Sequence, residues 1–474
     1  MRNQLIQPLG MAVHNQILTA GQMRDAERKL IAAGISETEL MDRAGRGVAE
    51  WIWRMAAGRS VTVLCGPGNN GGDGYVIAAT LHTRGLPVKV IAPFAPATPP
   101  AKAARDTYRG PLAEKFEPAS GATFVDCLFG SGLSRPIDNV LADAAAQLRA
   151  VHDIGVAVDL PSGIAADMGE LLNDVAPYDA TFALGAWKPA HWTGPGQDRM
   201  GKLRLIDIGI EPADSGTELV GTPIIEPPAT GAHKYSRGLV AVVAGAMPGA
   251  ALLSAQGAMG AGAGYVKLLA EHSHPAAPAD LVLDEQSLEE ALSDERIGAV
   301  LIGPGLGRDR KARARLADAL DSRHRLVIDA DALHLLGPET LATIDPACIL
   351  LTPHDGELAA LAKAFGAKGD TRLERARALS QQTGAAVLAK GCGTVLCADG
   401  RTGLFPPGSS WLSVAGSGDV LAGICAARMA GGASAYRAAS KAVYLHHEAA
   451  ELAGPSFSSS RLAAHVRRAM KQFL

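Results

Sequence analysis

The feature that most constrains the fold is an apolar run followed at once by a glycine-rich loop and then by a helical pattern. Residues 60–65 read SVTVLC, residues 66–74 read GPGNNGGDG, and residues 75–79 read YVIAA. In α/β proteins this order lets backbone N–H groups and a helix N-terminus hold a phosphate. Asn69, Asn70 and Asp73 add two amides and a carboxylate that a phosphate cradle alone does not need. The loop therefore predicts a nucleotide-like ligand and is compatible with catalysis on that ligand.

The length and the order of apolar runs predict two α/β domains. A chain of 474 residues is too long for one typical core, and residues 211–232 contain four prolines and no clear periodicity. We therefore expect domains at residues 1–225 and 226–474. Continuous Val, Ile and Leu runs that alternate with helices indicate a parallel sheet covered on both faces, which is a Rossmann-like arrangement in the first domain. The strands expected there are residues 60–65, 87–92, 122–128 and 154–160, with a helix at 74–84, and βα alternation restarts at 239–245.

Charge, hydropathy and cysteine usage exclude several classes of partner. The net charge is −3 and no Lys/Arg runs occur, so we expect no nucleic-acid partner. No window approaches 18 uninterrupted apolar residues, so a membrane span is not expected. The six cysteines are scattered without metal-binding spacing, which predicts reduced thiols and a cytoplasmic protein. We also expect a homo-oligomer, although no sequence feature defines its interface.

Three unusual loops of the first domain fall where the strands end. They are residues 66–74, residues 130–136 (GSGLSRP) and residues 159–163 (DLPSG). Ligands of parallel sheets bind at this edge. Asp126 and Asp159 end strands there; either alone could cap a helix, but together with the loops they favour a site. Oxygen ligands of the Asn, Asp and Ser types suit a hard cation, and a monovalent ion, magnesium or no ion remain open at this point.

The first half resembles the NAD(P)H-hydrate epimerase family over about residues 15–210. Residues 18–24 and 40–45 carry the likeness with GPGNNGGDG, DCLFGSGLSRP and DLPSG, in that order. The resemblance implies a potassium ion held by Asn70, Asp126 and Ser162. Inversion of the hydrated ring requires an acid–base carboxylate, for which Asp159 is the first candidate and Asp73 the second. The hydrate-binding residues that the resemblance implies are Asn69, Asn70, Gly71, Gly72, Asp73, Gly130, Ser131, Gly132, Leu133, Ser134, Arg135, Pro136 and Asp159.

The second half contains another glycine loop that opens a helix, at residues 415–419 (AGSGD). Its successive N–H groups would form an anion hole, and Asp419 is placed to take a proton from a hydroxyl as a phosphoryl group arrives. The alternative is a simple helix cap. Residues 390–394 (KGCGT) join two short strands and could bind nucleotide phosphates or form only a tight hairpin. His354 follows another strand and could be a ligand or a cap, and residues 303–307 (GPGLG) are a weak signal alone.

These elements, with residues 233–238 (HKYSRG), 247–251 (MPGAA) and 329–333 (DADAL), resemble the ribokinase-like NAD(P)H-hydrate dehydratase family over about residues 230–472. The resemblance implies a ribokinase-like α/β domain in which ADP phosphorylates the hydrate's hydroxyl, a magnesium ion assists, and phosphate then leaves. Ser417 stands where the family usually has Thr, and the segment at 272–283 is shorter than usual. The implied hydrate-binding residues are Ala250, Gly305, His354 and Asp419, and the implied nucleotide-binding residues are Lys390, Gly391, Cys392, Gly393, Thr394 and Gly418.

The leading hypothesis is a bifunctional repair enzyme that epimerises the R and S hydrates of NADH or NADPH and dehydrates the S form. A vitamin or sugar kinase with a regulatory first domain is an alternative, because fold and anion hole would be shared. A non-enzymatic alternative makes the first domain a ligand-gated interaction module. A Rossmann dehydrogenase is disfavoured because GPGNNGGDG lacks the G-x-G-x-x-G spacing, and a P-loop enzyme because G-x-x-x-x-G-K-[ST] is missing.

Overall fold

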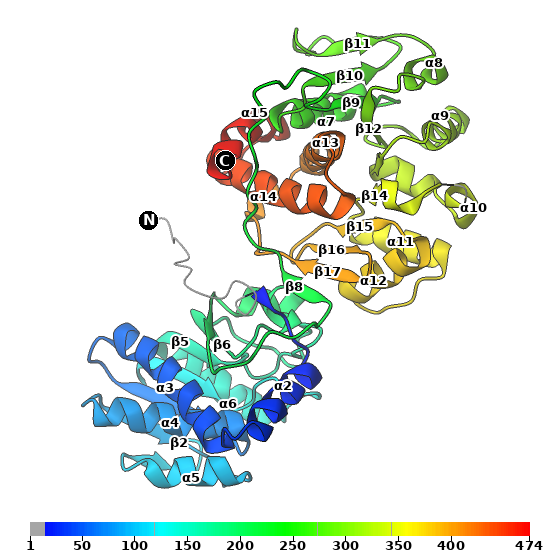
Figure 1. Cartoon of the computed structure of the whole chain (residues 1–474). Helices are drawn as coiled ribbons and strands as arrows, with labels where there is room; N and C mark the ends of the chain where they lie inside the picture. Colours follow the sequence, from blue (N-terminus) through cyan, green and yellow to red (C-terminus); the bar gives the residue numbers. More distant parts are fainter. Residues whose placement is uncertain (1–14, 118, 273, 343) are drawn as a thin grey trace. The chain divides into compact units, whose positions relative to one another are not determined.

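The computed structural model describes residues 15–117, 119–272, 274–342 and 344–474. Its contacts divide the chain into two compact units, the first ending at Leu219 and the second beginning at Val220 (Figure 1). Each unit is a sheet flanked by helices, so the predicted α/β fold class is confirmed. None of the helices in the described ranges is long and apolar enough to cross a membrane. Residues 1–14 of the predicted first domain lie outside the described residues.

The first unit is built on a seven-stranded sheet in which every neighbouring pair is parallel. The strand order β3-β2-β1-β4-β5-β6-β7 reverses between β1 and β4, as in Rossmann-like folds, and this switch point is where such sheets bind ligands. The elements are α2 (Ala20–Ala32), α3 (Glu37–Ala56), β1 (Val61–Cys65), α4 (Asn69–Thr83), β2 (Val88–Ile91), α5 (Pro99–Thr107), β3 (Leu112–Ala113), β4 (Gly121–Cys127), α6 (Asn139–Ala150), β5 (His152–Val158), β6 (Ala180–Leu184), the 3₁₀ turns η1 (Pro189–His191) and η2 (Pro195–Arg199), β7 (Lys202–Ile206) and β8 (Thr217–Leu219).

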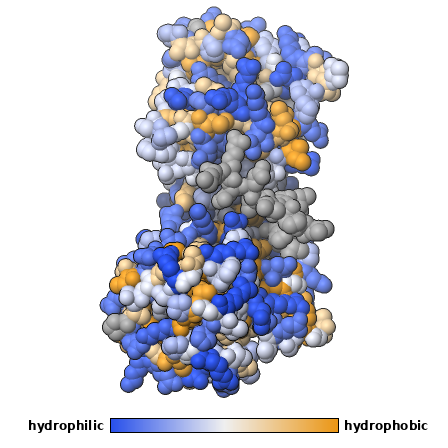
Figure 2. All heavy atoms as spheres, turned by 90° about the vertical axis from the view of Figure 1, so that its left-hand side faces the viewer, coloured by the Kyte–Doolittle hydropathy of each residue, from blue (hydrophilic) through white to orange (hydrophobic). Residues whose placement is uncertain are grey.

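Alternate residues of the central strands enter two separate hydrophobic cores. Val61 and Val63 of β1 pack with residues of α2, α3 and α4, whereas Leu64 packs with residues of α6 on the other face. Because both faces are covered, the strands are apolar on both sides, which is the pattern that the sequence shows. On the face of the molecule that Figure 2 presents, hydrophilic residues predominate and hydrophobic ones lie in small groups.

The helix after the glycine loop begins earlier than predicted, at Asn69 instead of residue 74. Glycine disfavours helix, but here it is needed for close packing. A Cβ at Gly71 would lie 1.9 Å from the Gly66 carbonyl oxygen, and one at Gly74 would lie 2.7 Å from Cys65 Sγ. The glycines therefore let α4 approach β1, and Asn69 and Asn70 stand in its first turn.

The strands of the second unit lie in a mainly parallel sheet in the order β11-β10-β9-β12-β13-β14-β15-β16-β17, in which β16 pairs antiparallel with both β15 and β17. Helices cover both faces (Figure 1). The elements are β9 (Leu239–Val243), α7 (Pro248–Gly260), β10 (Tyr265–Leu269), β11 (Val282–Asp284), α8 (Leu288–Leu292), β12 (Ile297–Ile302), α9 (Arg310–Asp321), β13 (Leu326–Ile328), η3 (Ala330–Leu335), α10 (Pro338–Leu341), η4 (Pro346–Cys348), β14 (Ile349–Leu351), α11 (Asp355–Phe365), α12 (Arg372–Thr383), β15 (Ala386–Ala389), β16 (Val395–Ala398), β17 (Arg401–Leu404), η5 (Ser410–Leu412), α13 (Ser417–Ala430), α14 (Ala435–Ala453), α15 (Ser459–Ala469) and η6 (Met470–Gln472).

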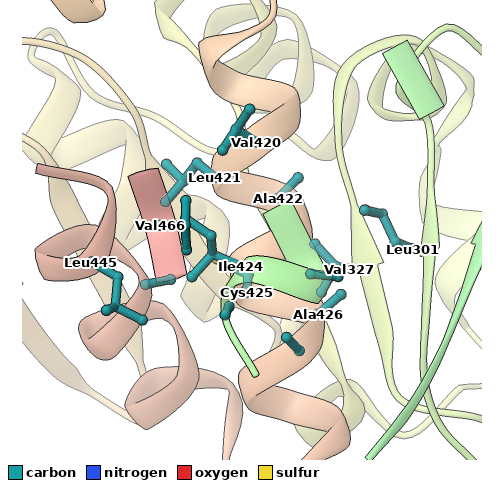
Figure 3. Packing of buried hydrophobic residues seen from close by; sticks show 14 of the residues in the cluster. Leu301, Val327, Val420, Leu421, Ala422, Ile424, Cys425, Ala426, Leu445 and Val466 are labelled. Carbon is teal, nitrogen blue, oxygen red and sulfur yellow. The ribbon is translucent and has the colours of Figure 1, made fainter. Parts of the chain in front are cut away.

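Helix α13 is the central element of the second core. It is apolar all round and lies between the sheet and helices α14 and α15 (Figure 3). Val420 and Ile424 of α13 are fully buried, as are Leu301 of β12 and Val466 of α15. A helix buried on every side is fixed in position, so its N-terminus, where Asp419 stands, is held rigidly against the ends of the strands.

Candidate active sites

A buried ion pair forms the centre of the site in the first unit. Asp159 follows β5 and has a φ of +63°, which turns the chain sharply at the strand's end. Lys188 Nζ lies 2.6 Å from Asp159 Oδ1, and the lysine side chain is only 1% exposed. The same ammonium group donates to the carbonyls of Leu184 and Ala186. Three acceptors therefore satisfy the buried ammonium group, as a buried cation requires.

Two carboxyl groups of this site have pKa values that are driven in opposite directions. Burial by itself would raise the pKa of Asp159, but the Lys188 charge and hydrogen bond, together with the Ser131 N–H at 2.8 Å, lower it to about 2. Burial raises the pKa of Asp73 well above its usual range, and the negative charges of Asp159 and Glu27 add to that rise. The two carboxyl groups thus differ in acidity, with Asp159 the stronger acid and Asp73 the weaker, a separation that assigns acid and base roles in many active sites.

His191 fixes the backbone around Asp159. Its Nδ1 accepts a hydrogen bond from the Lys188 N–H at 2.9 Å, and its Nε2 therefore donates to the Asp159 carbonyl at 2.8 Å. Burial and the nearby Lys188 charge lower the pKa of His191 to about 4. The imidazole is neutral at physiological pH and acts as a positioning group, because both of its nitrogens are occupied by main-chain contacts.

The buried side-chain amide of Asn70 lacks hydrogen-bond partners among the described residues. Both Oδ1 and Nδ2 of its side chain are buried and have no hydrogen-bond partner within the described part of the chain. Gly130 adjoins this amide and the Asp159 carboxylate, since a Cβ at Gly130 would lie 3.2 Å from Asn70 Cγ and 2.9 Å from Asp159 Oδ2. Buried polar atoms are nearly always paired, so a group outside the chain is expected to satisfy this side chain.

Asp126 and Ser162 are hydrogen-bonded directly to each other. The Ser162 hydroxyl lies 2.7 Å from Asp126 Oδ1 and within 3.1 Å of the Phe129 carbonyl, and the Ser162 N–H donates to Asp126 Oδ2. The Leu128 N–H and the Tyr178 hydroxyl also donate to the Asp126 carboxylate. Both carboxylate oxygens are thus already used, while the burial of Asp126 is complete.

The structure therefore brings together Asn70, Gly130, Ser131 and Asp159 of the predicted set, with Asp73 coupled to them by charge. Asn69 lies to one side, where its Oδ1 accepts from the Thr98 hydroxyl. Within the described residues, the loop beyond Ser131 makes no side-chain hydrogen bond or ion pair to this centre. Gly132, Ser134, Arg135 and Pro136 are exposed, and Leu133 is half-buried.

The site of the second unit is centred on the N-terminus of α13. Asp419 stands in its first turn, and Lys390 Nζ would lie 3.2 Å from a Cβ at Gly418. Lys390 in turn lies 2.5 Å from Asp329 Oδ1, and Asp329 is buried. Burial and the Asp329 charge raise the pKa of Asp419 to about 7 against the opposing effect of Lys390. A carboxyl group that titrates near neutrality beside an ammonium group and free helix N–H donors suits proton transfer during phosphoryl transfer.

A second ion pair anchors the loop at residues 390–394. Arg372 of α12 pairs with both carboxylate oxygens of Asp355 at 2.6 Å and also donates to the carbonyls of Cys392 and Gly393. The Thr394 hydroxyl donates to the Gly391 carbonyl across the turn. This loop connects β15 and β16 as predicted, and the arginine fixes its shape from outside.

Three other predicted residues of this unit are Gly305, Ala250 and His354. Gly305 has a φ of +63° and packs against Ala250, with 3.0 Å between its would-be Cβ and the Ala250 Cβ. His354 caps α11: its Nδ1 accepts from the Gly356 and Glu357 N–H groups. Its side chain is 60% exposed, so it can also contact a ligand. Among the described residues, His354 forms no hydrogen bond or ion pair with Asp419 or Ala250.

The sequence alone did not assign roles to Lys188, His191 or Arg372. A lysine inside the otherwise apolar stretch at residues 182–192 is the one signal that was available, since an uncompensated lysine is rarely buried. The partner of Arg372 is 17 residues away in sequence and could be found only from the fold. Of the residues that the structure describes, no three His, Cys, Asp or Glu side chains form a metal cluster.

Comparison with known proteins agrees with this geometry. Residues 240–472 match the family described as NAD(P)H-hydrate dehydratase, and residues 37–190 match the YjeF-related protein N-terminus. A protein of Gloeobacter violaceus named bifunctional NAD(P)H-hydrate repair enzyme Nnr is 34% identical over 92% of this chain and 93% of its own. The chain belongs to this family of bifunctional NAD(P)H-hydrate repair enzymes.

Further relatives also match over nearly their whole length. The enzyme of the same name from Mycobacterium leprae is 33% identical over 94% of this chain and 98% of its own length. A crystal structure of the ADP/ATP-dependent NAD(P)H-hydrate dehydratase from Bacillus subtilis, co-crystallised with ATP and Mg²⁺, is 27% identical. It covers 53% of this chain and 95% of its own, with a TM-score of 0.46.

Proposed function

We propose that the chain repairs hydrated NADH and NADPH, with an epimerase at residues 1–225 and an ADP-dependent dehydratase at residues 226–474. The observation that carries the proposal is the presence of two sites with acid–base groups poised for use. The first contains Asp73 and Asp159 with oppositely shifted pKa values, and the second contains Asp419 with a pKa of about 7. A cytoplasmic location and a homo-oligomeric state belong to the same proposal.

The first site supports epimerisation by reversible loss of the ring hydroxyl. Asp73, whose pKa is raised by burial, gives its proton to the hydroxyl at carbon six, and water leaves as the ring nitrogen forms an iminium. Water then adds to the opposite face and returns a proton to the Asp73 carboxylate. Asp159 stays ionised because of Lys188 and stabilises the cationic ring. The division of roles between the two carboxyl groups follows from their pKa values.

The polar groups around Asn70 fit a monovalent cation such as potassium. The Asn70 Oδ1 has free lone pairs. Gly130, which adjoins this amide, follows Phe129, whose backbone is hydrogen-bonded to the Ser162 hydroxyl. We propose that Asn70 Oδ1 binds the ion directly and that Asp126 and Ser162 complete the site by giving up some of the hydrogen bonds that now occupy them; the bound ion would contribute positive charge near the ligand. Melting temperature measured in potassium, sodium and choline chloride tests this, because a specific ion raises it and Asn70→Ala removes the difference.

The second site supports dehydration through a phosphate ester. Asp419 takes the proton from the hydrate's hydroxyl as its oxygen attacks the terminal phosphorus of ADP, so AMP leaves. Lys390 and the α13 N–H groups stabilise the negative charge that develops on the phosphoryl oxygens. The ring nitrogen's lone pair then expels phosphate, and loss of a proton from the adjacent ring carbon restores the dihydropyridine. Magnesium, held mainly by the ADP phosphates, supplies further charge neutralisation.

The dehydratase proposal is tested with the pure S hydrate, ADP and magnesium. We expect the absorbance of the reduced nicotinamide to return and AMP and phosphate to form in equal amounts. A stable phosphorylated product would favour a kinase instead. No reaction with either ADP or ATP would remove the dehydratase from the account.

A further inference from the structure

The residues described so far at the proposed epimerase site can contact only one half of its substrate. The groups at Asn70 and Asp159 can contact the hydrated nicotinamide ring, and the N-terminus of α4 can contact the pyrophosphate, since no side chain caps it. The substrate is a dinucleotide, so its adenosine half must lie beyond the pyrophosphate. The glycine loop separates two sides of the sheet edge, with β4 and β5 on one side and β2 and β3 on the other.

A cavity of about 620 Å³ lies on that other side. It is formed by residues 92–96, which directly follow β2, together with Leu112 and Glu114 of the β3 region and three residues of α5. Because β1, β2 and β3 are parallel, their carboxyl ends share one edge, and the cavity opens at the same edge as the glycine loop. This volume is in the range of small-molecule sites.

The cavity wall and the glycine loop are joined by hydrogen bonds. The Ala97 N–H donates to the Pro67 carbonyl at 2.8 Å, and the Thr98 hydroxyl donates to Asn69 Oδ1 at 2.7 Å. The segment after β2 is therefore fixed to the loop that leads to the nicotinamide side. Neighbouring strands are about 4.8 Å apart, so three spacings separate the cavity from the β4–β5 side by roughly 14 Å. A pyrophosphate-linked dinucleotide can bridge this distance.

The lining has the chemistry of a nucleoside site. Phe94 is half-buried and lies between Pro93 and Ala95, which gives an apolar wall for a flat base. Arg105 pairs with Glu114 at 3.0 Å across the cavity lining. Lys102 and Asp106 have no ion-pair partner among the residues that the structure describes, and both are exposed.

The charged side chains that line the cavity balance one another, and this balance indicates which part of a nucleotide can bind there. Two cations and two carboxylates line it, so the local net charge is near zero and suits a neutral adenosine better than a bare phosphate. The carboxylates can accept from the ribose hydroxyls, and Lys102 is free to meet any additional phosphate on the ribose.

We propose that this cavity is the binding site for the adenosine half of the hydrated dinucleotide. The proposal rests on the proposed epimerase activity and names the part of the substrate that supplies its remote binding energy. Contacts far from the reacting carbon strengthen binding of substrate and transition state without taking part in the chemistry.

The test compares a dinucleotide with a mononucleotide substrate. Ala95→Trp fills the cavity at an exposed position, and Ala103→Trp places the same side chain on an exposed position of α5 outside it. Epimerisation of the R hydrate of NADH is measured beside that of hydrated reduced nicotinamide mononucleotide, which lacks the adenosine half. Both variants are first compared with the wild type by melting temperature.

We expect Ala95→Trp to lower kcat/KM for the dinucleotide about tenfold or more and to leave the mononucleotide unchanged, while Ala103→Trp changes neither. Equal loss for both substrates, or no loss for either, would overturn the adenosine site while leaving the epimerase in place. A wild type that epimerises neither substrate would overturn the proposed function itself.

Discussion

At the scale of single residues, the first site depends on one buried charge pair. Asp159 and Lys188 are almost fully buried, and each is the other's main electrostatic partner. Removing one member leaves an uncompensated charge in the interior, which is far more costly than removing both. The free energy of unfolding therefore depends on the ionisation state of Asp159 and Lys188.

We expect Asp159→Asn and Lys188→Met each to lower the free energy of unfolding by about 3–5 kcal/mol. The double variant should lose less than the sum, because neither charge is left alone. Urea denaturation of the four proteins checks this double-mutant cycle. Strict additivity would show that the pair does not interact in solution.

The same pair predicts how stability depends on pH. The pKa of Asp159 is about 2 in the folded chain, below its ordinary 3.8, so the stabilisation is fully present above pH 4. It is lost as the pH falls from 4 towards 2, by on the order of 2 kcal/mol. The double variant should show a smaller loss of unfolding free energy over that interval. An unchanged pH profile would mean that Asp159 titrates normally.

Asp419 predicts the pH dependence of the second activity. Its pKa of about 7 means that kcat/KM for dehydration should rise with pH around neutrality as the carboxylate forms. Asp329→Asn removes a nearby negative charge and frees Lys390, so the midpoint should move to lower pH. Initial rates from pH 5 to 9 give both midpoints, and a midpoint that moves upward would contradict the assignment.

At the scale of elements, the glycine loop shows what the sequence can and cannot predict. Strand, loop and helix were evident from residues 60–79, but the helix begins five residues before the predicted start because glycines 71 and 74 serve packing. Strands β6 and β7 were missed: β6 is a short buried run without a periodic signal, and β7 is a five-residue strand at the edge of the sheet, too short for a clear period. Asp159, Asn70 and Asp419 could be selected from motifs. The partner of Asp159 could not, because Lys188 meets it only through the fold, and the same holds for Arg372, which anchors the loop at residues 390–394.

The close approach of α4 to the glycine loop predicts how a single added methyl group changes stability. Gly71→Ala places a Cβ against the Gly66 carbonyl and should lower the free energy of unfolding by about 1–3 kcal/mol through overpacking. Gly68→Ala is a matched control, because its φ is −90° and no atom lies within 4 Å of its added Cβ. Equal stability of the two variants in thermal unfolding would show that α4 is not held in this way.

At the scale of the whole molecule, the two units carry separate chemistry on one chain. Each has its own sheet, its own core and its own acid–base groups, so each activity should be removable alone. Asp419→Asn should stop dehydration and leave the exchange of R and S hydrates intact. Hydrate exchange followed without ADP checks this, and loss of both activities in a folded Asp419→Asn protein would show that the units are not independent.

The most direct test of the account is the conversion of an equal mixture of R and S hydrates by the intact chain with ADP and magnesium. The account predicts complete return of the reduced-nicotinamide absorbance with the wild type. A folded Asp73→Asn variant should stop early in the reaction at about half of that absorbance, because only the S form is then consumed. A wild type that stops at half would contradict the central claim that one chain performs both steps, and complete conversion by Asp73→Asn at the wild-type rate would remove Asp73 as the acid of the first step.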